Sequence, residues 1–128
     1  MRLLLDTHAF LWFLMGDPRL SASARALIQD VANERLLSVG SLWEMAIKTS
    51  LGKLALSAPF DVLIPQQLAI NGVEPLGISV EHTAVVSTLP FHHRDPFDRL
   101  IIAQATVESI PIVSMDTAFD MYAVKRLW

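Results

Sequence analysis

The sequence predicts an α/β fold, a three-layer α/β/α sandwich with a mostly parallel central sheet of four to five strands. Short apolar runs alternate with segments of helical spacing along the chain. The runs at 3–5 and 112–113 are continuously apolar, as strands buried on both faces are. Alternating strands and helices imply crossover connections between parallel strands. The length suits one domain, residues 1–128.

In the first half of the chain we expect two strands and three helices. They are a strand at 3–5, helices at 7–15 and from Ser21 to Val31, a strand at 36–39 and a helix from Ser41 to Gly52. Gly16-Asp17-Pro18 ends the first helix. Ala24, Leu27, Ile28 and Val31 share one face of the second helix. Ser41 and Glu44 match a capping box, which predicts the start of the third helix.

The second half continues the alternation. We expect one or two short helices over 59–70 broken near Pro65, a strand over 73–78, helices at 79–89 and 96–108, a strand over 111–114, a short helix from Thr117 and a last edge strand at 127–128. Pro75 places its strand at an edge, because proline cannot donate to a central ladder. Asp95-Pro96 combines an N-cap with proline at the first helical position.

Four acids are expected to converge at the carboxyl end of the sheet, where ligands bind in such folds. Asp6 directly follows the first strand and Asp116 follows the strand that ends at Ser114, while Glu44 and Asp98 lie in the first turns of helices. Each also has a structural interpretation, as an N-cap or a capping-box member. Together, four like charges repel unless cations neutralise them, and carboxylates suit Mg²⁺ or Mn²⁺. We therefore predict metal-assisted phosphodiester hydrolysis.

Histidines, arginines and one lysine also lie near the four acids in the sequence or in the predicted fold. Hard cations prefer oxygen, so we do not expect histidine ligands among His8, His92 and His93, and we place the last two at the pocket rim. Arg94 and Arg99 either pair with surface acids or contact phosphate. Lys48 should form an ordinary helix ion pair with Glu44, one turn away.

Composition limits the remaining classes. The chain has no cysteine, which excludes disulfides and thiolate metal sites. Its hydrophobic content of 52% and mean hydropathy of +0.42 predict apolar surface covered by a partner or a second copy. A net charge of −3 argues against a broad nucleic-acid surface but allows a basic rim. No apolar run is long enough to span a bilayer, and Asp6 interrupts a signal-like start, so we expect a cytoplasmic protein.

Four blocks of the sequence resemble PIN-domain nucleases, and in particular the VapC-type toxin branch of bacterial toxin–antitoxin systems. They are Leu-Leu-Leu-Asp-Thr-His at 3–8 with Leu11-Trp12, the segment 43–48, the block from His92 to Ala105, and Ser114-Met115-Asp116 with Phe119. The resemblance implies a single PIN-like domain with endoribonuclease activity on RNA, dependent on Mg²⁺ (or Mn²⁺). It assigns catalysis and metal binding to Asp6, Glu44, Asp98 and Asp116. Ser114 would support a neighbouring carboxylate or a water, and Asp95 would serve mainly as the N-cap.

The resemblance also implies partners. A cognate antitoxin segment would occupy a groove formed partly by the first helix, and the apolar surplus favours a homodimer. Two other functions stay open: a catalytically silent binding module with a PIN fold, and a metal-dependent phosphatase. The phosphatase is disfavoured because Asp6 is followed by Thr7-His8 rather than by the second acid of an Asp-x-Asp motif. A neighbouring reading frame for a DNA-binding protein would favour the toxin role.

Overall fold

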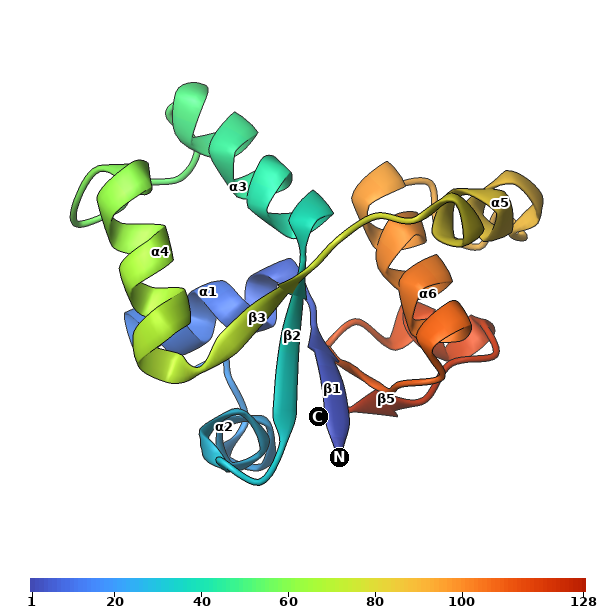
Figure 1. The fold of residues 1–128 in the computed structure, drawn as a ribbon, viewed down its shortest axis with the longest axis horizontal. Coiled ribbons are helices and arrows are strands. Elements are labelled where there is room, and N and C mark those ends of the chain that lie inside the picture. The colour runs from blue at the N-terminus through green and yellow to red at the C-terminus, as the bar shows by residue number, and fades with distance from the viewer.

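The computed structural model describes residues 1–128 and contains one five-stranded, fully parallel sheet in the order β3-β2-β1-β4-β5 (Figure 1). The strands are β1 (Arg2–Leu5), β2 (Glu34–Ser38), β3 (Val73–Leu76), β4 (Ile112–Val113) and β5 (Arg126–Leu127). This confirms the predicted parallel sheet. β3, which contains Pro75, and the short β5 form its two edges, also as predicted.

Helices cover both faces of the sheet. They are α1 (Thr7–Met15), α2 (Ala22–Gln29), α3 (Val39–Ser50), α4 (Phe60–Asn71), α5 (Val80–Thr88), α6 (Pro96–Glu108) and the 3₁₀ helix η1 (Thr117–Met121). In Figure 1, α1, α2 and α4 lie on one side of β1 and β2, and α5 and α6 lie on the other. None of these helices combines the length and the apolar character that crossing a bilayer requires.

Alternation along β1 divides the core into two parts. Leu3 and Leu5 pack into the cluster that contains Phe10 of α1, whereas Leu4 packs into the cluster that contains Ile102 of α6 and Phe119 of η1. Successive side chains of a strand point to opposite faces, so one apolar run supplies both layers. Because β1 is the central strand and is buried on both faces, Asp6, the residue that follows it, is held firmly at the carboxyl end of the sheet.

The start of α3 differs from the prediction. The helix begins at Val39, and its N-cap is Ser38, whose Oγ accepts a hydrogen bond from Gly40 N at 3.0 Å. The predicted capping box of Ser41 and Glu44 is therefore wrong. Both residues lie inside the helix and are buried there. The strand ends one residue earlier than expected, so the cap moves upstream and frees Glu44 for another role.

Two other helix predictions are corrected. α4 continues through Pro65 without a break. Pro65 lies on the exposed face, so the carbonyl of Asp61, which loses its helical partner, is on the solvent side. α2 ends at Gln29, which leaves Val31 outside the helix and 88% exposed rather than on its buried face.

One glycine allows α3 to approach α6 closely. A Cβ on Gly40 would lie 2.5 Å from Cδ2 of Leu100, so a larger residue would require the two helices to separate or Leu100 to move. Gly40 is one turn before Glu44, and Leu100 is two residues after Asp98. The contact therefore brings two of the predicted site acids, from separate helices, towards the same end of the sheet.

Candidate active site

Asp6 and Asp116 are fixed at the ends of neighbouring strands. Asp6 caps α1 by accepting a hydrogen bond from Ala9 N at 2.6 Å, and its other oxygen accepts one from Ser114 Oγ at 2.5 Å. Asp116 caps η1 by accepting from Ala118 N at 2.9 Å. The structural and functional interpretations of these acids are thus compatible, since each cap uses one oxygen. Ser114 contacts a neighbouring carboxylate, as the sequence suggested.

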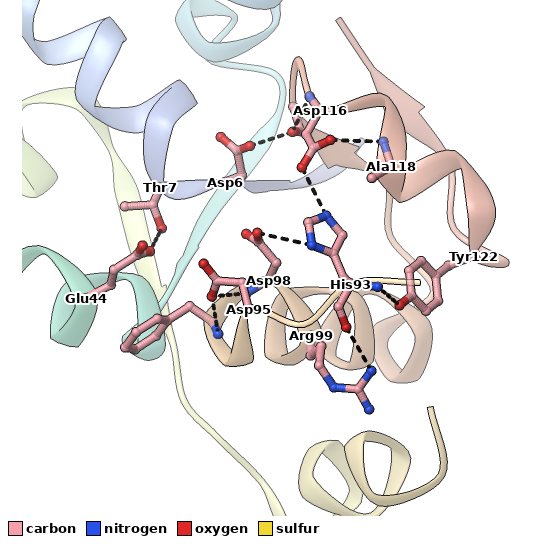
Figure 2. A network of polar contacts seen from close by, with 12 residues as sticks. Asp6, Thr7, Glu44, His93, Asp95, Asp98, Arg99, Asp116, Ala118 and Tyr122 are labelled. Carbon is pink, nitrogen blue, oxygen red and sulfur yellow. Dashed lines mark hydrogen bonds and ion pairs between the residues drawn. The ribbon is translucent and has the colours of Figure 1, made fainter. Parts of the chain in front are cut away.

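Glu44 is buried on α3, and two partners hold its carboxylate. Thr7 Oγ1 donates to its Oε1 at 2.7 Å, and Lys48 Nζ lies 3.1 Å from its Oε2. The second contact confirms the predicted ion pair. Thr7 Oγ1 also lies 2.9 Å from the buried hydroxyl of Ser41. This chain of contacts joins the first turn of α1 to α3 and aims Glu44 towards the sheet edge (Figure 2).

Asp98 lies in the first turn of α6 with little compensation for its charge. Burial, together with the negative charges of Asp95, Asp6 and Glu44, raises its pKa to about 7, although His93 acts in the opposite direction. Asp95 is the N-cap of α6 and accepts from Phe97 N at 2.8 Å and Asp98 N at 3.4 Å. The two acids of the Asp95–Asp98 pair therefore have separate roles.

His93 lies between Asp98 and Asp116 (Figure 2). Its Nδ1 is 3.6 Å from Asp98 Oδ2, and its Nε2 is 3.0 Å from Asp116 Oδ2. One ligand atom from each of these three residues falls within 4.8 Å of the others. The pocket-rim position predicted for both histidines is wrong for His93, whereas His92 is exposed and packs against Tyr122.

Arg99 has neither of its predicted roles. Its guanidinium is buried and donates hydrogen bonds to four carbonyl oxygens. One is in the last turn of α5, that of Val86 (3.2 Å), and three are in the segment between α5 and α6, those of Leu89 (3.0 Å), Pro90 (2.9 Å) and His93 (3.3 Å). Tyr122 OH accepts from His93 N at 2.7 Å and donates to Pro90 O at 2.8 Å. Arg99 and Tyr122 together fix the loop 89–95 beside the acids. Arg94 is exposed and forms no ion pair with Asp95.

Two further features lie next to the acids. A cavity of about 310 Å³ is lined by Asp6, His8, Trp12, Met115, Asp116 and Thr117. Trp43 and Phe97 connect α3 to α6 edge to face, with ring centroids 5.5 Å apart, and Trp43 is 63% exposed. Each aromatic residue immediately precedes an acid of the site, so this pair could have been found from the sequence pattern of an aromatic residue followed by an acid.

The four acids are close enough to affect one another. Asp6 and Glu44 raise the pKa of Asp98. The pKa of Asp6 is raised mainly by burial and also by Asp116. Such a concentration of carboxylates favours binding of a cation over proton loss alone, and oxygen donors suit hard divalent ions. The residues present therefore fit a divalent metal, and the arrangement is able to support metal-assisted hydrolysis.

Known proteins resemble this chain in both sequence and structure. The model of the PIN domain family matches residues 3–125. Ribonuclease VapC16 from Mycobacterium tuberculosis (strain ATCC 25618 / H37Rv) is 44% identical over 71 residues, which cover 52% of this chain and 50% of that relative. The match thus spans about half of that relative's length.

Solved structures show the same fold over nearly the whole chain. VapBC2 from Rickettsia felis, bound to a DNA fragment from its promoter, gives a TM-score of 0.72 at 16% identity and covers 99% of this chain and 98% of that chain. VapBC-1 from nontypeable Haemophilus influenzae gives a TM-score of 0.71 at 14% identity, with coverages of 99% and 97%. At these identities the likeness establishes the fold alone.

Proposed function

This chain belongs to the PIN domain family, and from that premise we propose that it is a metal-dependent endoribonuclease acting as the toxin of a toxin–antitoxin pair. The main supporting observation is that four acids, Asp6, Glu44, Asp98 and Asp116, lie near one end of a parallel sheet, where Asp6 and Glu44 act on Asp98 and Asp116 acts on Asp6. A ribonuclease that is 44% identical over part of its length supports the choice of RNA as substrate.

These four acids would hold Mg²⁺ or Mn²⁺, with Ser114 and Asp95 in supporting positions. A bound divalent cation supplies an acidified water and stabilises the developing charge on the leaving oxygen. The chain's own side chains set the positions of the acids. Ser114 orients Asp6, and Thr7 with Lys48 orients Glu44. Asp95 begins the helix that presents Asp98.

The surroundings of the acids suit a single RNA strand. The cavity lined by Asp6 and Asp116 would give a strand access to these two carboxylates. The exposed ring of Trp43, supported by Phe97, offers a face on which a base stacks. Arg94, which is exposed near the acids, is placed to contact a phosphate and balance the negative site.

We further propose an antitoxin segment and a second copy of this chain as partners. A groove of about 510 Å³ lies beside α1 and α4 and is lined by Leu11, Leu14, Met15, Ala55, Leu56, Ser57, Leu63 and Gln67. An amphipathic helix that buries its apolar side chains there would suit this groove. The solved relatives named VapBC support a partner of this kind. A homodimer would cover part of the remaining exposed apolar surface.

The enzymatic proposal is tested by removing single carboxylates. We expect Asp6→Asn and Asp98→Asn each to reduce divalent-dependent RNA cleavage at least about 100-fold, because each removes a metal ligand. Asp120→Asn is the matched control, since Asp120 is exposed and pairs only with Arg126. Cleavage at the wild-type rate by either folded site variant would contradict the proposal. A wild-type chain that binds neither Mg²⁺ nor Mn²⁺ would favour the silent binding module.

A further inference from the structure

We propose that His93 is a nitrogen ligand of this metal site and that it shifts the preference of the site from Mg²⁺ towards Mn²⁺. The inference rests on the proposed function and adds a fifth donor to its four carboxylates. It starts from the position of the imidazole, which separates Asp98 from Asp116 instead of lying at the pocket rim. A cation shared by these two acids would meet the ring.

The spacing of the donor atoms supports direct ligation. Ligands about 2.1 Å from a metal stand about 3 Å apart on adjacent octahedral corners and about 4.2 Å apart on opposite corners. His93 Nε2 and Asp116 Oδ2 are 3.0 Å apart, and one atom from each of His93, Asp98 and Asp116 lies within 4.8 Å of the others. His93 Nε2 and Asp116 therefore already have the spacing of adjacent ligands, whereas Asp98, which faces Nδ1 of the ring at 3.6 Å, would have to move closer to share the same ion.

The imidazole is held in this position by contacts outside the site. The backbone N–H of His93 donates to Tyr122 OH, and its carbonyl accepts from Arg99. The side chain is only 14% exposed, and its ring packs against Phe119 with centroids 5.3 Å apart. A surface histidine that met the acids by chance would not have both backbone groups and its ring face fixed. His92, its neighbour, has an exposed side chain.

The chemistry of the donor set gives the expected selectivity. Mg²⁺ is a hard cation that favours oxygen ligands, whereas imidazole nitrogen binds first-row transition metals more strongly. Four carboxylates alone would accept either ion. Adding His93 stabilises bound Mn²⁺ more than bound Mg²⁺, so the ratio of the two dissociation constants depends on this side chain.

The test uses the full chain and the metals alone, without RNA. Free Mn²⁺ is followed by EPR during titration, and Mg²⁺ is measured by competition. For His93→Ala we expect Mn²⁺ binding to weaken at least about tenfold, with a smaller change for Mg²⁺. Pulsed EPR of the Mn²⁺-loaded wild type should detect a directly bound nitrogen, and His93→Ala should lose that coupling. His92→Ala is the matched control and should retain both properties.

Other results would overturn the inference. Wild-type protein that binds Mn²⁺ without nitrogen coupling would exclude ligation by His93. Tighter Mn²⁺ binding by His93→Ala would show that the ring competes with the cation. His93→Asn serves as a second variant if the alanine variant unfolds, and it should also lose the nitrogen coupling. If the wild type binds neither metal, the proposed function fails together with this inference; if only the coupling is absent, the proposed function stands.

Discussion

The two sides of the site differ in how the chain compensates its buried acids. On the α3 side, Glu44 accepts a hydroxyl hydrogen bond from Thr7 and pairs with Lys48. On the α6 side, Asp98 has only the 3.6 Å contact with His93, and burial together with the charges of three other acids raises its pKa. The α3 side is therefore balanced by the chain itself. A bound cation should therefore stabilise the uncompensated carboxylate on the α6 side more than the carboxylate on the α3 side.

The two sides also differ in what holds them in place. The pair of Glu44 and Lys48 is one turn apart on a single helix, so its geometry is local. The α6 side depends on the loop 89–95, which has no regular secondary structure and is fixed by the long-range contacts of Arg99 and Tyr122. When packing is disturbed, we therefore expect the loop 89–95 to lose its structure before the α3 helix does.

The largest expected change in the free energy of unfolding follows from removing the guanidinium of Arg99, which holds the loop 89–95 in place. Arg99→Met leaves four carbonyl oxygens without their shared donor, one of them that of His93. We expect the free energy of unfolding to fall by about 3 kcal/mol or more, because buried carbonyls lose charged hydrogen-bond partners. Urea unfolding followed by circular dichroism measures this loss.

Arg94→Met is the control for that experiment, since Arg94 lies in the same loop and is exposed. Its free energy of unfolding should stay within about 0.5 kcal/mol of the wild type. Arg99→Lys keeps the charge but cannot reach four carbonyls from one ammonium, so it should recover only part of the stability. Equal stability of Arg99→Met and wild type would show that the loop does not depend on Arg99.

In the absence of metal, we expect Asp98→Asn to increase the free energy of unfolding, by less than Arg99→Met decreases it. The pKa of Asp98 is about 7 in the folded chain, above its usual value of 3.8. The unfolded chain therefore releases this proton first, and wild-type stability falls as the pH rises from about 4 to 7. At pH 8, Asp98→Asn should be more stable than the wild type by about 1–3 kcal/mol, and the two should converge near pH 4.

Bound metal acts in the opposite direction, because it stabilises the wild type more than Asp98→Asn, and this provides a check. At a Mn²⁺ concentration of 100 times its dissociation constant, the wild type gains about 2.7 kcal/mol, whereas Asp98→Asn gains less. Glu44→Gln is the comparison variant. It should not be stabilised at pH 8, because it removes a carboxylate that Lys48 already compensates. Thermal unfolding with and without a chelator distinguishes these cases. If Asp98→Asn were less stable than the wild type at pH 8 without metal, the Asp98 carboxylate would not be the uncompensated charge of the site.

Sequence alone was enough to predict where the acids lie but not to identify the residues that hold them in place, and the catalytic role of the acids stays a prediction. The positions of Asp6 and Asp116 were predictable because Asp6 directly follows an apolar strand, Asp116 lies shortly after another, and parallel strands end at the same end of a sheet. His93 and Arg99 were not, since their roles depend on the path of an irregular loop. The expected capping box of Glu44 failed for a local reason: Ser38 was an equally good cap three residues upstream. Local signals thus predicted the sheet and the acids, whereas tertiary contacts decided how each acid is supported.

The smallest effect should come from making the α3 side resemble the α6 side. Lys48→Met removes the ammonium beside Glu44 and leaves Thr7 as the remaining partner. We expect the free energy of unfolding to fall by only about 0.5 kcal/mol, while Mn²⁺ binds about two to three times more tightly, because one positive charge beside the acids is gone. Lys53→Met, at an exposed position after α3, is the control. If Lys48→Met weakened Mn²⁺ binding instead, Lys48 would be needed to hold the Glu44 carboxylate in the position in which it binds the metal.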